Sequence, residues 1–112
     1  MERVYFTEYK RKKFLYIDMS KCSAEEMFAV IAKASEIIRS QPESSVFSIT
    51  DVTDAWFDPD VIDAMKEFLI GNKPYVVAAA VVGVTGKVMK LFGRRLVLFD
   101  TVKQAKEWLA DR

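Results

Sequence analysis

The chain has 112 residues, of which 51% are hydrophobic and 29% are charged, and its formal net charge is +1. This length suits one domain with a sizeable core, and the composition is typical of a folded globular protein rather than a disordered one. A net charge so close to zero provides no overall attraction to nucleic acid or to an anionic membrane surface. We therefore predict a single folded domain that has no nucleic-acid partner.

The rarest residue types restrict the chemistry further. The chain has no histidine, which removes the usual general base near neutral pH and the usual transition-metal ligand. Its one cysteine, Cys22, cannot form an internal disulfide, which favours a reducing compartment. The longest apolar run, Tyr75–Val82, is too short to cross a bilayer, and the N-terminus lacks an apolar signal segment. We expect a cytoplasmic, non-enzymatic protein with no catalytic residue, no metal, no cofactor and no membrane insertion.

The first half of the chain alternates between strand and helix patterns. Residues 3–9 and 13–19 are strand-like runs around a basic turn, which predicts a hairpin. Ser23 and Glu26 have the spacing of a capping box, so a helix is expected from there to about residue 39. Residues 45–50 predict the next strand, and Asp58 with Pro59 predicts the cap and first turn of a second helix.

The second half continues the alternation. Tyr75–Val82 is almost continuously apolar, which predicts a central strand covered on both faces. A glycine-containing turn and a short helix at 86–92 precede a strand at 96–99, and Thr101 with Gln104 caps a last helix. The order ββαβαβαβα predicts a single-domain α/β fold. Its four- to five-stranded sheet is mostly parallel, is flanked by helices and has the hairpin as an antiparallel edge.

The turn after the strand at 45–50 is the first candidate site. From residue 41 to residue 65 there are six acidic residues and no lysine or arginine. Their spacing is not that of a calcium loop, and the helix dipole alone favours carboxylates in a first helical turn. Two interpretations remain open: a solvated turn with a helix cap, or a site that contacts a partner, with an aromatic anchor, or an ion. The candidate residues are Asp51, Thr53, Asp54, Trp56, Asp58 and Asp60.

The second candidate is the turn after the apolar strand. Amides at the start of a helix can bind an anion, and residues 71–99 contain five basic residues and no acidic one. The turn is not a P-loop, because two residues rather than four separate its glycines, and we expect no nucleotide hydrolysis. The alternative is that the glycines serve only tight backbone geometry. The candidate residues are Gly83, Thr85, Gly86 and Lys87.

Both turns follow the carboxyl ends of parallel strands and should therefore emerge at one edge of the sheet, where ligands usually bind in such folds. One turn is acidic and the other is basic. We predict that this edge binds a protein partner, or closes a homodimer by pairing acid with base across a twofold axis. The alternative is a small-molecule ligand, either an anion or an apolar molecule in a pocket lined by the apolar strands.

The chain resembles the STAS domain, specifically the SpoIIAA-like group of STAS/SEC14 domain-containing proteins. The element order and the stretches 46–58, 72–76, 80–86 and 93–101 carry this resemblance. It implies a non-enzymatic interaction module, and its SEC14 side suggests lipids. Phosphoregulated proteins of this fold carry a serine where this chain has Asp58-Pro59-Asp60, which offers no hydroxyl group. The resemblance therefore predicts a regulatory fold without its phosphoserine switch.

Overall fold

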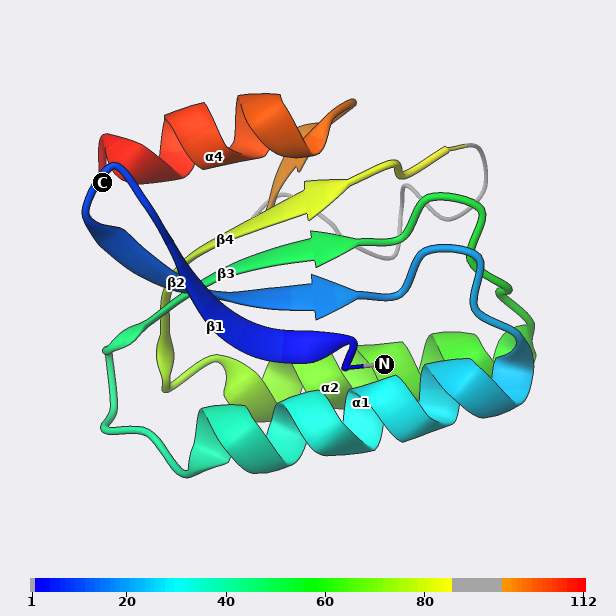
Figure 1. Ribbon diagram of the computed structural model, residues 1–112. Helices are drawn as coiled ribbons and strands as arrows, with labels where there is room; N and C mark the ends of the chain where they lie inside the picture. Colours follow the sequence, from blue (N-terminus) through cyan, green and yellow to red (C-terminus); the bar gives the residue numbers. More distant parts are fainter. Residues whose placement is uncertain (1, 86–95) are drawn as a thin grey trace.

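One mixed sheet organises the molecule. The computed structural model describes residues 2–85 and 96–112. Within them, five strands lie in the order β1-β2-β3-β4-β5 (Figure 1). Only β1 is antiparallel to its neighbour; the other pairs are parallel, so the predicted mostly parallel sheet with a hairpin at its edge is confirmed. The strands are β1 (Val4–Tyr9), β2 (Lys12–Asp18), β3 (Val46–Asp51), β4 (Val76–Val82) and β5 (Val97–Phe99).

The described helices cover both faces of this sheet. Helices α1 (Ala24–Arg39) and α2 (Pro59–Asn72) lie on one face, and α4 (Val102–Ala110) lies on the other (Figure 1). Each begins at the predicted cap: Ser23 forms a capping box with Glu26, Asp58 accepts a hydrogen bond from the amide of Val61, and Thr101 forms a capping box with its own N3 residue. The short helix predicted at 86–92 lies outside the described residues.

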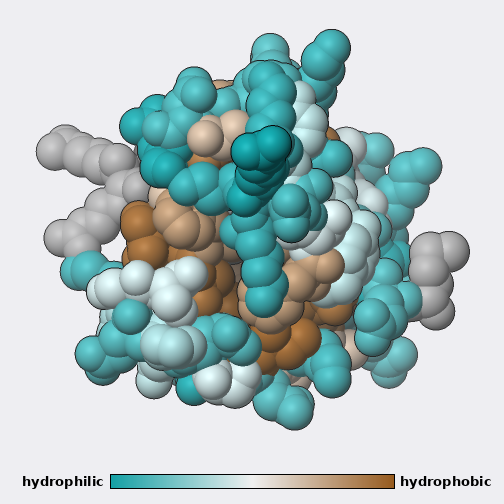
Figure 2. Space-filling model, turned by 60° about the vertical axis from the view of Figure 1, so that its left-hand side comes forward, coloured by the Kyte–Doolittle hydropathy of each residue, from teal (hydrophilic) through white to brown (hydrophobic). Residues whose placement is uncertain are grey.

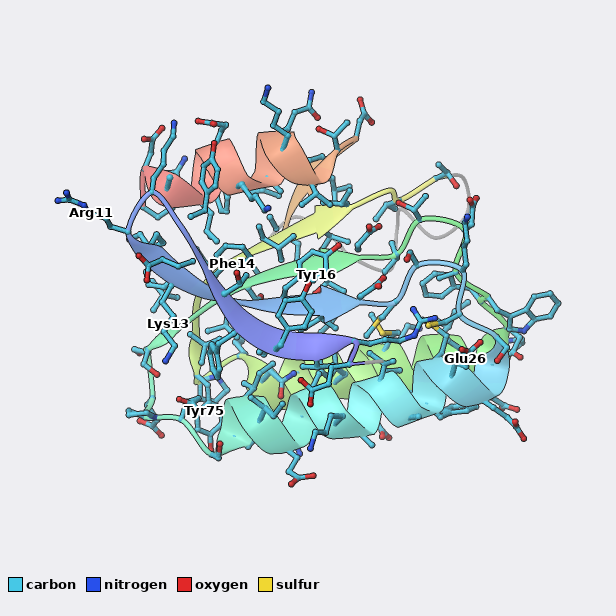
Figure 3. The ribbon with its side chains drawn as sticks, in the orientation of Figure 1. Arg11, Lys13, Phe14, Tyr16, Glu26 and Tyr75 are labelled. Carbon is cyan, nitrogen blue, oxygen red and sulfur yellow. The ribbon has the colours of Figure 1, made fainter. Side chains whose placement is uncertain are left out.

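The hairpin turn differs from the predicted four-residue basic turn. Only Lys10 and Arg11 connect the strands, with φ angles of 50° and 69°, and Lys12 already belongs to β2. Positive φ at both central residues is the type I′ geometry, whose twist matches that of the flanking strands. The Arg11 side chain extends away from the molecule (Figure 3).

The core has two parts because successive side chains of a strand face opposite sides of the sheet. Leu15 and Ile17 of β2 pack in the larger cluster under α1 and α2, where Met27 and Met65 are also fully buried. Phe14 faces the other way and joins the smaller cluster under α4. Alternation along the 13–19 run of the sequence predicts this division, with Leu15 and Ile17 opposite Phe14, and the structure confirms it.

The prediction that the apolar strand is covered on both faces is wrong for its first half. Residues 80–82 of β4 are buried and pair with β5. The preceding residues 76–79 are half-buried or exposed, and Val77 is 51% exposed. β5 has three residues and pairs only with the second half of β4, so the first half of β4 lies at the edge of the described sheet.

Candidate functional site

The predicted edge exists, and its loops are bonded to one another. The amide of Lys21 donates to the carbonyl of Thr53 at 2.9 Å, and the amide of Gly83 donates to the carbonyl of Phe99 at 3.0 Å. Gly83 also lies against Thr53, because a Cβ atom at Gly83 would be 2.9 Å from the Thr53 Cα atom. The acidic turn and the first residue of the glycine turn are therefore brought together as predicted.

Two carboxylates at this edge are engaged within their own loops. Asp51 Oδ1 accepts hydrogen bonds from the Thr53 amide at 3.0 Å and the Thr53 hydroxyl at 2.6 Å. Asp18 makes the same pair of bonds with Ser20, at 2.9 Å and 2.5 Å, so that β2 and β3 end in the same kind of turn. Within residues 2–85 and 96–112, no group of three acidic or cysteine side chains is arranged to hold a metal ion.

Of the two aromatic side chains in the acidic turn, one packs in the core and the other lies at the surface. Phe57 packs against the core under α1 and α2, whereas Trp56 is 56% exposed. The Trp56 indole donates to Asp58 Oδ2 at 2.9 Å. The Val61 amide and this indole hold the pKa of the Asp58 carboxyl below its usual value. Asp58 is thus a helix cap that also orients an exposed tryptophan.

The remaining candidates are placed only in part. Asp54 and Asp60 are exposed, and Asp54 has a positive φ of 56°. Thr85 is exposed at the end of the described segment. Gly86 and Lys87 lie outside the described residues, and with them most of the basic half of the predicted edge.

A titratable tyrosine lies beside Asp51. Burial raises the pKa of the Tyr16 hydroxyl above its usual value, and the charges of Asp51 and Asp18 raise it further. Because ionisation is harder in the folded state, the contribution of Tyr16 to stability is complete below pH ~10 and is lost as the pH rises beyond it. We expect Tyr16→Phe to lose less stability than the wild type between pH 8 and pH ~11. Urea unfolding at both pH values measures this; equal losses in the two proteins would contradict it.

A cavity of about 820 Å³ opens beside the exposed half of β4. Ile17, Ile38, Met65 and Phe68 contribute to its inner wall, and Val77 to its rim. From the hairpin side, Figure 2 shows apolar side chains gathered in a hollow of the surface. This volume is within the range of small-molecule binding sites.

Two buried hydroxyl groups line the cavity. Ser48 is 4% exposed and Thr50 is 7% exposed, and both lie on β3. No buried side-chain nitrogen or oxygen among the described residues is left without a hydrogen-bond partner, and the third buried polar residue, Asn72, accepts a hydrogen bond from Arg39 Nε at 3.3 Å. A pocket lined by the apolar strands was predicted from the sequence as an alternative, but neither of these hydroxyl residues was among the candidates. The local signal for the pocket was available: Val46, Ser48 and Thr50 alternate on the core-facing side of β3, where apolar residues are expected.

Comparisons with known proteins identify no relative: no family model matches the chain, and no curated protein or solved structure matches it. The described residues define an α/β protein with a five-stranded mixed sheet. No helix among them is both long enough and apolar enough to cross a membrane.

Proposed function

We propose that the protein binds a small, largely apolar molecule in the cavity beside β4. The observation that carries this proposal is the pairing of an apolar cavity of about 820 Å³ with the buried hydroxyls of Ser48 and Thr50. Small-molecule sites are mostly apolar and carry a few polar groups that orient the ligand. A ligand with one hydrogen-bonding group would fill the cavity and bond to these hydroxyls. The resemblance to STAS/SEC14 proteins points the same way.

The chemistry of the lining favours binding over catalysis. Its described residues are apolar or uncharged, apart from Lys73 and Arg112, which are exposed. The described wall therefore offers no carboxylate or thiol to serve as a base or nucleophile. We accordingly propose a binding protein rather than an enzyme.

Titration with the neutral fluorescent probe 1-N-phenylnaphthylamine tests this function. We expect saturable binding to the wild type, and a loss of about tenfold or more in affinity for Ala79→Phe, because a new benzyl group would occupy the cavity. Ala32→Phe is the matched control: residue 32 is exposed on α1, and its substitution should leave the affinity unchanged. Absence of binding to the wild type, or equal binding by Ala79→Phe, would overturn the proposal.

A second proposal concerns the carboxyl edge of the sheet, where we expect contact with a protein partner or with a second copy of the chain. The observation that favours it is Trp56, which is 56% exposed and is oriented by its hydrogen bond to Asp58. Exposed, preorganised tryptophans are frequent anchors of protein interfaces. The resemblance to STAS domains, which act mostly as interaction modules, agrees with this assignment.

A further inference from the structure

The mouth of the cavity carries two cationic side chains that come from opposite faces of the sheet. Lys73 is the C-cap of α2, and Arg112 follows α4. Both are exposed and both line the cavity, which reaches around the exposed half of β4 from one helix layer to the other. The Arg112 guanidinium lies 4.5 Å from the centre of the Trp108 ring, which also lines the cavity. This stacking positions the planar guanidinium at the opening.

Among the described residues, neither of these two cations forms an ion pair with an aspartate or glutamate side chain. The ion pairs among the described residues join Arg3 to Asp18 and Glu26, and Lys10 to Glu107. The residues whose structure is not described, Met1 and 86–95, include four basic side chains and no acidic one. They therefore supply no side-chain carboxylate to Lys73 or Arg112. Positive charge at an apolar cavity, with no aspartate or glutamate side chain paired to it among the described residues, favours an anionic ligand.

The apolar surroundings determine which end of such a ligand enters. Ile70 and Val77, at the rim, are 74% and 51% exposed, and the wall behind them is apolar. An ionised group inside this wall would lose its hydration without gaining a cation, whereas a hydrocarbon chain gains by leaving water. The charged group therefore belongs at Lys73 and Arg112 and the chain inside, where a neutral polar group meets Ser48 and Thr50.

From these observations, and resting on the proposed function, we infer that the ligand is a medium-chain carboxylate with a hydroxyl or keto group on its chain. Its carboxylate lies at the mouth of the cavity, where the charges of Lys73 and Arg112 attract it. Its hydrocarbon chain lies against β4 and α2, and its neutral oxygen pairs with the hydroxyls of Ser48 and Thr50. No bond is made or broken in this process.

Displacement of 1-N-phenylnaphthylamine by three ligands of equal chain length tests the inference: decan-1-ol, decanoate and 10-hydroxydecanoate. We expect decanoate to bind the wild type about tenfold more tightly than decan-1-ol, and added salt to weaken decanoate alone. We expect 10-hydroxydecanoate to bind more tightly still, because it pairs the β3 hydroxyls.

The variants separate the two contacts. Lys73→Met with Arg112→Met should reduce decanoate affinity to that of decan-1-ol and leave decan-1-ol unchanged. Lys66→Met is the control, since residue 66 is an exposed lysine of α2 outside the described lining. Ser48→Ala with Thr50→Val should remove the advantage of 10-hydroxydecanoate over decanoate and retain that of decanoate over decan-1-ol.

The outcomes distinguish this inference from the proposed function. If neither the probe nor any of the three ligands binds the wild type, the proposed function fails. If the probe binds but decan-1-ol and decanoate bind equally, only the carboxylate contact is overturned. If 10-hydroxydecanoate has no advantage over decanoate, the contact with Ser48 and Thr50 is overturned.

Discussion

Replacing Phe14 with alanine is expected to lower the free energy of unfolding by about 3–5 kcal/mol. Phe14 is 1% exposed and belongs to the small cluster between the sheet and α4, where Ala105 and Leu109 are also buried (Figure 3). Six buried residues form this cluster among those that the structure describes, and the loss of one benzyl group leaves a void that neighbouring side chains fill only in part. Urea unfolding followed by circular dichroism measures the change.

Phe6→Ala is the matched control in the same hairpin. Phe6 is 37% exposed on the edge strand, and the Lys13 Nζ atom lies 4.4 Å from the centre of its ring. We expect this substitution to cost less than about 1 kcal/mol, because much of the ring is already in contact with water. A similar loss of stability in the two variants would show that α4 does not depend on Phe14 for its attachment.

Gly83→Ala is expected to be the most damaging substitution at the carboxyl edge. Gly83 has a φ of +81°, and an added Cβ would overlap the Thr53 hydroxyl and lie 2.9 Å from the Thr53 backbone nitrogen. The left-handed conformation alone costs a residue with a side chain about 1–2 kcal/mol, and the overlap with Thr53 adds to this. Thermal unfolding and urea unfolding should both show the loss.

Gly71→Ala is the control for Gly83→Ala, because it makes the same substitution at a position where the backbone does not require glycine. Gly71 lies inside α2, where an added Cβ would meet the Arg39 guanidinium, whose Cζ atom would be 2.9 Å away. That contact is with the end of a flexible side chain, which can move, and alanine favours a helix over glycine by about 1 kcal/mol. We expect a change of stability within about 1 kcal/mol of zero. A larger loss than for Gly83→Ala would contradict the assigned role of Gly83.

The parts of the fold that were predicted correctly depend on local chemistry. Helix α1 starts at the capping box of Ser23 and Glu26, and α2 starts at the Asp58 cap, which Pro59 follows. The hydrogen bonds of both caps join residues within four positions of each other. The face on which Phe14 lies follows from alternation along one strand. Such signals are complete within a short window of sequence, so reading them requires no knowledge of distant packing.

The parts that were missed depend on distant segments. The apolar composition of residues 75–82 predicted full coverage, but β5 has three residues and pairs only with the second half of β4. The cavity likewise arises from how α2, α4 and β4 pack around one edge of the sheet. The apolar strands suggested a pocket, but its position was marked locally by Ser48 and Thr50, two hydroxyl side chains at positions where the pattern of β3 predicts apolar ones.

The twin turns that end β2 and β3 have a consequence for any partner of the carboxyl edge. In each, one aspartate holds both the amide and the hydroxyl of the residue two positions later: Asp18 holds Ser20, and Asp51 holds Thr53. These bonds order the backbone of both loops before any contact is made. A molecule that docks there would lose little conformational entropy in arranging the surface, and more of its interaction energy would appear as affinity.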